Sequence, residues 1–294
     1  MIVAPTIVSL REGIEAALVI AIMLSYLRKS NQEDMRKFVL GGATVAVFAS
    51  IGIALVMGLL WGTFEGPMLA IFEGSVVLIA AVLLTTMIVW MWKAGATVST
   101  EIQESVQITT EKQNWLGLAL LSFSLVLREG VELVLFSMAL VVQDGVEIYF
   151  GVGLGLLLAA GLGIGIYRGS LQISLQSLFK WTSAFLLLVA AGMVAYGIHE
   201  LQEGGLLLIG PIEIWNINPP QLPDGSYPLL HDKGLIGGLA KAIFGYNGNP
   251  SFLEVLGYSA YMMILVGYYI LKRRLGSSPR FSQDNQELVK SMAA

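Results

Sequence analysis

The sequence predicts an all-α integral membrane protein with seven transmembrane helices, and three observations lead to this fold class. Of the 294 residues, 55% are hydrophobic and only 13% are charged, which gives a mean hydropathy of +0.73. Apolar runs of about 20 residues, the length of a helix that crosses a bilayer, recur along the chain. Most charged residues lie in the connections between these runs. A soluble protein of this length could not bury so much apolar surface.

Seven apolar runs are long enough to be spans. They cover residues 2–27, 38–61, 68–93, 115–142, 148–167, 179–202 and 252–272. We therefore expect one transmembrane domain over 1–275 and a polar cytoplasmic tail over 276–294. The polar connection 94–114 is expected to include a helical extension with a solvated face. The long outer loop 204–251 is expected to act as a lid or docking surface, with a short helix over 235–246.

Lysine and arginine residues set the predicted orientation of these spans. They occur in the connections after the first, third and fifth spans and in the tail, whereas the connections 62–67 and 143–147 contain none. The residues concerned are Arg28, Lys29, Arg36, Lys37, Lys112, Arg168, Lys272, Arg273, Arg274, Arg280 and Lys290. Because basic residues collect on the cytoplasmic side, we expect the N-terminus outside and the C-terminus inside.

The first and fourth spans contain the same charged motif of five residues. It reads Arg11-Glu12-Gly13-Ile14-Glu15 in the first span and Arg128-Glu129-Gly130-Val131-Glu132 in the fourth. A charge at the bilayer centre costs roughly 2.5 to 3.5 kcal/mol, so six charges would cost on the order of 15 to 20 kcal/mol. Some compensating interaction must therefore offset this cost.

The spacing within the motif predicts how the charges are arranged. Residues three apart share a helix face, so the two glutamates of each motif point the same way, and each arginine can pair with the glutamate four residues later. Two such helices laid together would gather four carboxylates and two guanidinium groups, a formal charge of −2. This acidic surplus indicates that a cation or protons supply the balance. The expected metal ligands are Glu12, Glu15, Glu129 and Glu132, supported by Arg11 and Arg128.

Composition limits the chemistry of such a site. The chain has no cysteine and only two histidines, His199 and His231, which excludes thiolate metal sites and iron–sulfur clusters. A metal site inside the membrane must be built mainly from oxygen atoms, which favours hard cations. The sequence has no nucleophile and base pair and no metal-protease motif, so we expect neither an enzyme nor a bound cofactor.

The predicted orientation makes the two motif helices antiparallel. The first span runs inward and the fourth outward, an offset of three spans with inverted direction. This pattern is typical of an inverted 3+3 repeat with its substrate site near the bilayer midplane. The repeats would cover about 2–93 and 115–202, and the seventh span would lie outside them.

Further acidic residues lie toward the outer ends of spans. Glu73 in the third span could pass a cation to the central cluster, or could cap its helix or pair with an arginine. Glu200 and Glu203 share a helix face beside His199 at the end of the sixth span. They could collect cations at the mouth, or simply be solvated acids at a helix end. The glycines of the fifth span indicate close helix packing rather than a dinucleotide site.

The paired motif, in a chain of seven predicted spans with an outside N-terminus, resembles the oxidase-coupled high-affinity iron permease family, which includes fungal permeases and bacterial EfeU-type relatives. Further stretches similar to the bacterial branch are LREGIEAAL at 10–18, FEG at 72–74, FKWT at 179–182, VAAG at 189–192 and IFGY at 243–246. The resemblance implies iron import across the cytoplasmic membrane, with the four motif glutamates handling iron. It also implies an extracytoplasmic iron-oxidising or iron-binding partner protein. Fungal members carry an outer acidic motif, for which Glu200-Leu201-Gln202-Glu203 is a loose match here.

The residues alone leave other functions open. A proton-coupled transporter of another cation or a small solute could use the same acids as a proton relay. A structural or receptor protein could contain them as a buried salt-bridge core. Iron ions and lipid are the expected partners and nucleic acid is not, while the oligomeric state, including a homo-oligomer, is left open.

Overall fold

In the computed structural model the described residues are 2–94, 98–167, 175–211, 213–218, 220–222, 227–232 and 234–276, and all their regular structure is helical. The helices are α1 (Val3–Lys29), the short 3-10 helix η1 (Glu33–Met35), α2 (Arg36–Trp61), α3 (Gly66–Ala94), α4 (Val98–Glu111), α5 (Trp115–Asp144), α6 (Ile148–Tyr167), α7 (Leu175–Glu203), α8 (Leu235–Phe244) and α9 (Phe252–Gly276). The all-α prediction is therefore confirmed for this part of the chain.

Five of the described helical segments are long and apolar enough to cross a membrane. They are Glu33–Trp61, Gly66–Trp90, Ile148–Gly165, Trp181–Glu203 and Phe252–Leu271. Two further helices, α1 with 27 residues and α5 with 30, are as long but contain the charged motifs. The molecule is thus a multi-pass membrane protein, while the count of seven spans stays a prediction.

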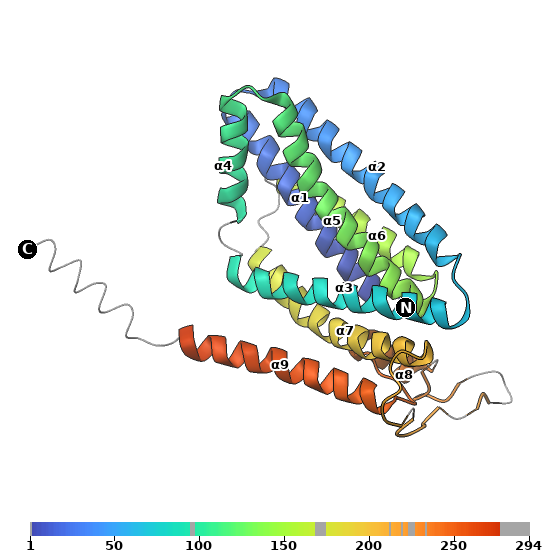
Figure 1. Cartoon of the computed structure of the whole chain (residues 1–294). Helices are drawn as coiled ribbons and strands as arrows, with labels where there is room; N and C mark the ends of the chain where they lie inside the picture. The colour runs from blue at the N-terminus through green and yellow to red at the C-terminus, as the bar shows by residue number, and fades with distance from the viewer. Residues whose placement is uncertain are drawn as a thin grey trace, which may run out of the picture.

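Two groups of helices make up the molecule (Figure 1). In the first, α1 packs against α6 and α2 packs against α5, with α1 and α5 in contact between them. In the second, α7 lies between α3 and α9. Contacts of α3 with α5 and of α1 with α7 join the groups, so the two motif helices lie where they meet.

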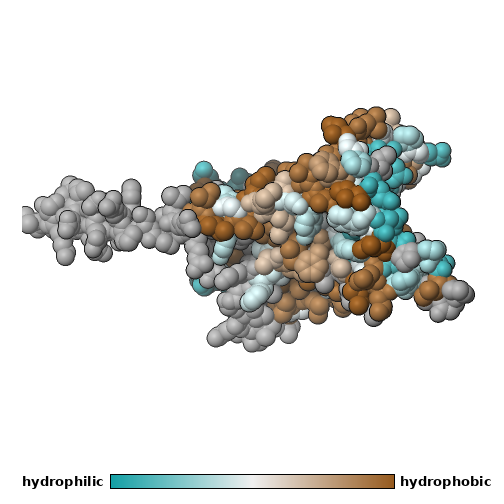
Figure 2. Space-filling model, turned by 90° about the horizontal axis from the view of Figure 1, so that it is seen from below, coloured by the Kyte–Doolittle hydropathy of each residue, from teal (hydrophilic) through white to brown (hydrophobic). Residues whose placement is uncertain are grey.

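Successive helices run back and forth between two ends of the molecule. The N-terminus, the connection between α2 and α3, and α8 lie at one end, which is on the right in Figure 1. The connection between α1 and α2 lies at the opposite end, together with α4. Seen from below in Figure 2, hydrophobic residues cover much of the surface, and hydrophilic residues gather near the end that carries α8.

Glycines allow the helices of the first group to approach closely. A Cβ added to Gly13 would lie 2.6 Å from the Cβ of Ala159 in α6. A Cβ added to Gly130 would lie 2.8 Å from the Cβ of Ser50 in α2, and closer still to its Oγ. The middle residue of each motif is therefore a contact point with a neighbouring helix.

Three glycines of α6 confirm the packing role expected for this span. Gly151 and Gly155 abut the first turns of α1, and Gly163 abuts Ala17. Gly153 and Gly161 face the other way, with no described atom within 4 Å of an added Cβ. The stripe that faces α1 recurs every four or eight residues, as helical geometry requires.

The connection after α3 contains the expected helix with a solvated face, and a second face of this helix is buried. In this helix, α4, Ile102 and Val106 are buried against Met23 and Leu27 of α1 and Leu118 of α5. One face of α4 is therefore part of the core, and its exposed residues include Glu104. The alternation of Ile102 and Val106 with polar residues at four-residue spacing explains this amphipathic packing.

The segment after α7 includes the expected short helix, α8. This helix contacts α7 and, to a lesser extent, α1. Gly245, which ends α8 with φ of 67°, lies so close to Gly192 that a Cβ on Gly192 would be 2.6 Å from its Cα. Gly192 lies eleven residues before the end of α7. The end of α8 therefore packs about three helical turns back along α7 from its last residue.

Candidate functional site

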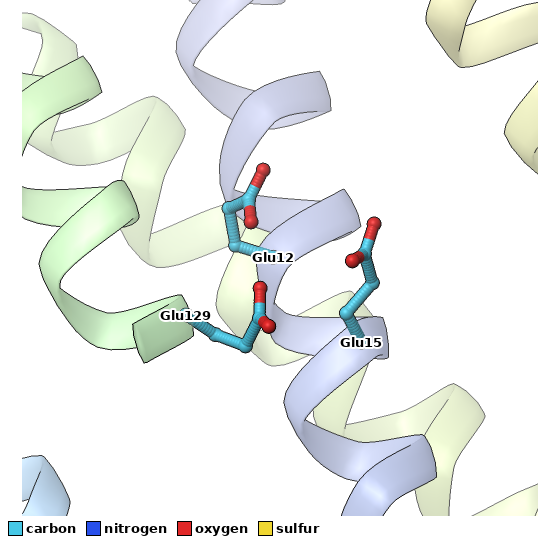
Figure 3. Close-up of side chains that lie close together, drawn as sticks. All are labelled: Glu12, Glu15 and Glu129. Atoms are coloured by element: carbon cyan, nitrogen blue, oxygen red, sulfur yellow. The ribbon is translucent and has the colours of Figure 1, made fainter. Parts of the chain in front are cut away.

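Three motif glutamates from two helices form the centre of the candidate site. Glu12 and Glu15 come from α1 and Glu129 from α5, and one carboxylate oxygen of each lies within 4.8 Å of the other two (Figure 3). Glu12 and Glu129 are buried, and Glu15 is partly buried. The spacing of three residues in α1 and the contact between α1 and α5 together produce this group.

Local features place the motifs inside continuous helices. α5 begins after Asn114, whose side chain accepts a hydrogen bond from the Gly117 backbone N–H at 2.9 Å, and ends at Gly145 with φ of 79°. α1 has Arg28 and Lys29 in its last turn, where their positive charges interact favourably with the negative end of the helix dipole. Neither motif lies near a helix end, so backbone hydrogen bonds are satisfied within each helix.

Each arginine pairs along its own helix, as the spacing predicts. Arg11 Nη2 lies 3.2 Å from Glu15 Oε1, and Arg11 Nη1 lies 3.4 Å from Glu12 Oε1. In α5, Arg128 Nε donates a hydrogen bond to Glu132 Oε1 at 3.0 Å. The guanidinium groups therefore offset part of the negative charge, and the remaining charge of the six groups is still negative.

Several carboxylate oxygens at the centre are buried without a hydrogen-bond donor. Among the described residues, Glu12 Oε2, Glu129 Oε2 and Glu132 Oε2 accept no hydrogen bond. A buried carboxylate oxygen without a donor is costly unless a cation or a proton occupies the space beside it. Grouped carboxylate oxygens are the ligands that hard cations prefer. The arrangement can therefore hold a positive ion.

The structure differs from the sequence expectation at Glu132. The spacing predicts four carboxylates in one cluster, but the close group contains three, and Glu132 is not a member. Its carboxylate is bound to Arg128 instead. The side chain of Glu132 is largely buried, with 12% of its surface exposed. Glu132 lies three residues after Glu129 in α5, so it is adjacent to the group.

The two motif arginines occupy unlike surroundings although their local sequences match. The side chain of Arg11 is 0% exposed, and its Nη1 lies 2.9 Å from Met87 Sδ of α3. The side chain of Arg128 is 50% exposed, and its Cζ lies 5.6 Å from the ring centroid of Trp90, also in α3. The single helix α3 therefore touches both arginines.

The outer acids lie apart from the central group. Glu73, Glu200 and Glu203 line one cavity of about 460 Å³ together with Gly66 and Pro67. The Glu73 carboxylate accepts a hydrogen bond of 2.7 Å from Trp61 Nε1, a contact that differs from both structural roles expected for it, helix capping and pairing with an arginine. The cavity lies at the end of the molecule where α3 begins and α7 ends.

His199 lies between Glu203, whose Oε2 is 4.0 Å from its Nε2, and α9. It is not among the residues that line the cavity, and its Nδ1 lies 2.8 Å from Glu254 Oε1 of α9. Glu254 is buried and also accepts hydrogen bonds from Asn247 Nδ2 and the Ser251 backbone N–H. His199 thus links α7 to the start of α9.

Sequence reasoning missed three residues that contact the site or its surroundings. Met87 and Trp90 both touch motif arginines, although neither is among the residues predicted for the site. Glu254 was assigned no role. Their separation of three residues places Met87 and Trp90 on one face of α3, but only the positions of neighbouring helices reveal which residues that face meets.

Known proteins are similar to this chain over nearly its whole length. Residues 2–278 match the model of the iron permease FTR1 family. The ferrous iron permease EfeU of Escherichia coli strain 536 is 33% identical over 277 residues, which cover 93% of this chain and 97% of the relative. The protein of the same name from Yersinia pestis is 31% identical, over 92% and 94% of the two chains. An uncharacterized protein of Archaeoglobus fulgidus is 33% identical over 88% and 92%. No solved structure matches the chain.

Proposed function

Because this chain belongs to the iron permease FTR1 family, we propose that it imports iron through a glutamate site between α1 and α5, near the middle of the cytoplasmic membrane. The observation that carries this proposal is the group of Glu12, Glu15 and Glu129, in which buried carboxylate oxygens from two helices lie together without donors. Iron is the cargo here, and the family supplies its identity. The oxygen ligands by themselves support only a hard cation.

We infer that α1 and α5 also cross the membrane, which makes seven spans. Both helices exceed the roughly 20 residues that a bilayer requires. Both are enclosed by helices that are themselves apolar enough to span. The described basic residues Arg28, Lys29, Arg36 and Lys37 lie at the end opposite the N-terminus, which supports an outside N-terminus and an inside C-terminus.

The pattern of helix packing supports an inverted repeat. Under this proposal α1, α2 and α3 correspond to α5, α6 and α7. The contact of α1 with α6 then corresponds to the contact of α5 with α2, and the contacts of α1 with α5 and of α3 with α7 correspond to themselves. Close approaches at Gly13 and Gly130 follow the same correspondence. Such a pseudo-two-fold axis places the substrate site between the repeats.

The proposed mechanism uses the chain's own groups in three ways. The outer acids Glu73, Glu200 and Glu203 raise the local concentration of iron at the mouth. The central carboxylates then replace part of the ion's hydration shell, and Glu132 is close enough in the chain to join them. Arg11 keeps the centre from becoming so negative that the ion cannot leave. Carboxyl groups that are protonated when the site is empty must release their protons to bind metal. Iron uptake therefore depends on pH.

The outer loop and a partner protein complete the proposal. The described residues of the segment 204–251, which include α8, lie at the end of the molecule where iron would enter. We propose that an extracytoplasmic protein that oxidises or binds iron delivers its cargo at this end. The site itself needs only one copy of the chain, because all its residues come from α1 and α5.

A direct test of the site is the position of bound metal. In crystals soaked with iron, anomalous scattering at the iron edge is expected to show a peak between α1 and α5, within bonding distance of Glu12 and Glu129. Glu129→Gln crystals soaked in the same way serve as the control and are expected to lose the peak. A peak only in the outer cavity, or none at all, would contradict the proposed site.

The outer acids should affect capture more than throughput. In a variant with Glu73→Gln and Glu200→Gln, we expect the iron concentration for half-maximal uptake to rise about three- to tenfold, because the mouth no longer attracts cations. The maximal rate should change little. Glu213→Gln, at an exposed acid of the outer loop, is the matched control. A loss of maximal rate with unchanged half-saturation would assign the two acids to the conduction path instead.

The rival proton-coupled transporter makes a different prediction in reconstituted vesicles. If the chain carries iron, radioactive iron should accumulate in vesicles that contain the protein, and Glu129→Gln should prevent accumulation. If the acids serve as a proton relay for another solute, iron should not accumulate, and a protonophore should abolish transport of that solute.

A further inference from the structure

We propose that Trp90 is a positioning residue that holds Arg128 away from the central carboxylates and so keeps their oxygens available to the ion. The inference rests on the proposed function of the site. It assigns a task to α3, a helix that contains no part of the repeated motif.

The two motif arginines differ in burial and in the number of glutamates that they contact. Arg11 is fully buried and lies between two glutamates, 3.2 Å from Glu15 and 3.4 Å from Glu12. Within the part of the chain that the structure describes, Arg128 makes one ion pair, from Nε to Glu132, and its side chain is half exposed. Motifs with the same charged residues at the same spacing would place both guanidinium groups alike if nothing else acted on them. A contact outside the motifs must therefore separate them.

The contact that differs is the one with α3. Arg11 meets the thioether of Met87, whereas the guanidinium of Arg128 lies 5.6 Å from the centroid of Trp90. An arginine within about 6 Å of an indole ring is attracted to the negative face of the ring. Met87 and Trp90 are three residues apart, so one face of α3 provides both contacts. Arg11 donates a hydrogen bond to the thioether and still reaches both glutamates of its motif, whereas the guanidinium of Arg128 is drawn to an aromatic face.

The central carboxylates are where Arg128 would go without this attraction. Arg128 already pairs with Glu132 through Nε, whereas Glu12 Oε2 and Glu129 Oε2 of the central group are buried and accept no hydrogen bond among the described residues. The Nη groups of Arg128 are donors that fit carboxylates, and arginine pairs with two oxygens at once where geometry allows. A guanidinium released from the ring would move toward these oxygens and compete with the cation for them. Trp90 thus preserves vacant ligand atoms at the site.

The test is a measurement of iron binding that does not depend on transport. Purified full-length protein in detergent is equilibrated with radioactive Fe²⁺ under reducing conditions, and the dissociation constant is determined. Trp90→Leu is expected to weaken binding roughly tenfold, because the cation must displace the arginine. Trp90→Phe retains an aromatic face and should remain within about threefold of the original protein. Trp181→Leu, at an indole that is 77% exposed, is the matched control and should bind normally.

A double-mutant cycle shows whether Trp90 acts through Arg128. In an Arg128→Gln background, Trp90→Leu should leave binding unchanged within about twofold, since no guanidinium remains to be held. Equal weakening in both backgrounds would show that Trp90 acts only by packing, and unchanged or tighter binding by Trp90→Leu would also overturn the proposal. If the leucine variant does not fold, Trp90→Met preserves the volume without the ring and is measured in its place.

The outcome separates this inference from the proposed function. If the unaltered protein binds no iron, or if Glu129→Gln binds it equally well, the glutamate site itself is wrong. If the unaltered protein binds iron and Glu129→Gln does not, the site stands, and the Trp90 variants alone decide whether the indole positions Arg128.

Discussion

Replacement of Glu129 by glutamine is expected to reduce iron uptake by about 30-fold to about 4,000-fold. Removing one charged partner from a buried cluster typically costs 2 to 5 kcal/mol, and every 1.4 kcal/mol is a factor of ten. Glutamine has nearly the same shape, so the contact between α1 and α5 is retained, while its amide presents a donor where the ion needs an acceptor. Uptake of radioactive iron into vesicles with a known amount of inserted protein measures this effect.

The matched control for this prediction is Glu104→Gln in α4, which alters an exposed acid and should leave uptake unchanged. Glu12→Gln should act like Glu129→Gln, because both residues belong to the same close group and both are buried. Normal uptake by either variant would contradict a carboxylate site between the motif helices.

The same series decides whether three or four carboxylates bind the ion. Glu132 lies outside the close group, bound to Arg128. If it remains there, Glu132→Gln should reduce uptake less than Glu129→Gln, because only an ion pair at the edge of the site is lost. A loss as large as that of Glu129→Gln would mean that Glu132 leaves Arg128 and joins the ligands when iron arrives.

Much of this site follows from sequence because the motif contains its own geometry. The spacing of three residues places Glu12 and Glu15 on one helix face, and the spacing of four pairs Arg11 with Glu15, as the structure has it. Burial of charge in the membrane requires the two helices to meet. These are properties of single helices and of the bilayer, so they can be read from the chain without a three-dimensional structure.

The difference between the two halves could not be predicted in this way. The motifs are nearly identical, so sequence reasoning treats Arg11 and Arg128 alike, whereas one is fully buried and the other half exposed. The cause lies in α3, where the residues that meet the arginines are a methionine and a tryptophan. Which face of α3 meets which arginine depends on how the two helix groups cross, and local sequence does not specify that crossing.

The motif glycines show a second limit of sequence reasoning. Gly13 and Gly130 occupy the same position in the two motifs, but the spacing of the charged residues predicts no role for either glycine. In the structure each is the point where a neighbouring helix comes closest, α6 for Gly13 and α2 for Gly130. The glycine-rich stripe of α6 was the available signal, since small residues on one helix need small residues on the facing helix.

Gly130→Ala is accordingly expected to destabilise the folded protein by about 1 to 3 kcal/mol, the usual cost of inserting a methyl group into a packed interface. The added Cβ would lie 2.8 Å from the Cβ of Ser50, a distance that a change of rotamer cannot relieve, so α2 and α5 must separate. Separation would shift Glu129 and Glu132 on either side, and uptake should fall together with stability. The midpoint of thermal unfolding in detergent measures the first effect, and vesicle uptake the second.

A compensating change distinguishes this steric cause from any other role of the glycine. Ser50→Gly removes the colliding atoms from α2, so the double variant Gly130→Ala with Ser50→Gly should recover most of the stability and uptake. The same logic applies on the other side of the site, where Ala159→Gly should rescue Gly13→Ala. Gly153→Ala and Gly161→Ala, where an added Cβ meets no described atom within 4 Å, should be close to neutral. If Ser50→Gly fails to rescue Gly130→Ala, the glycine is required for something other than close approach, and the packing argument for both motifs is wrong.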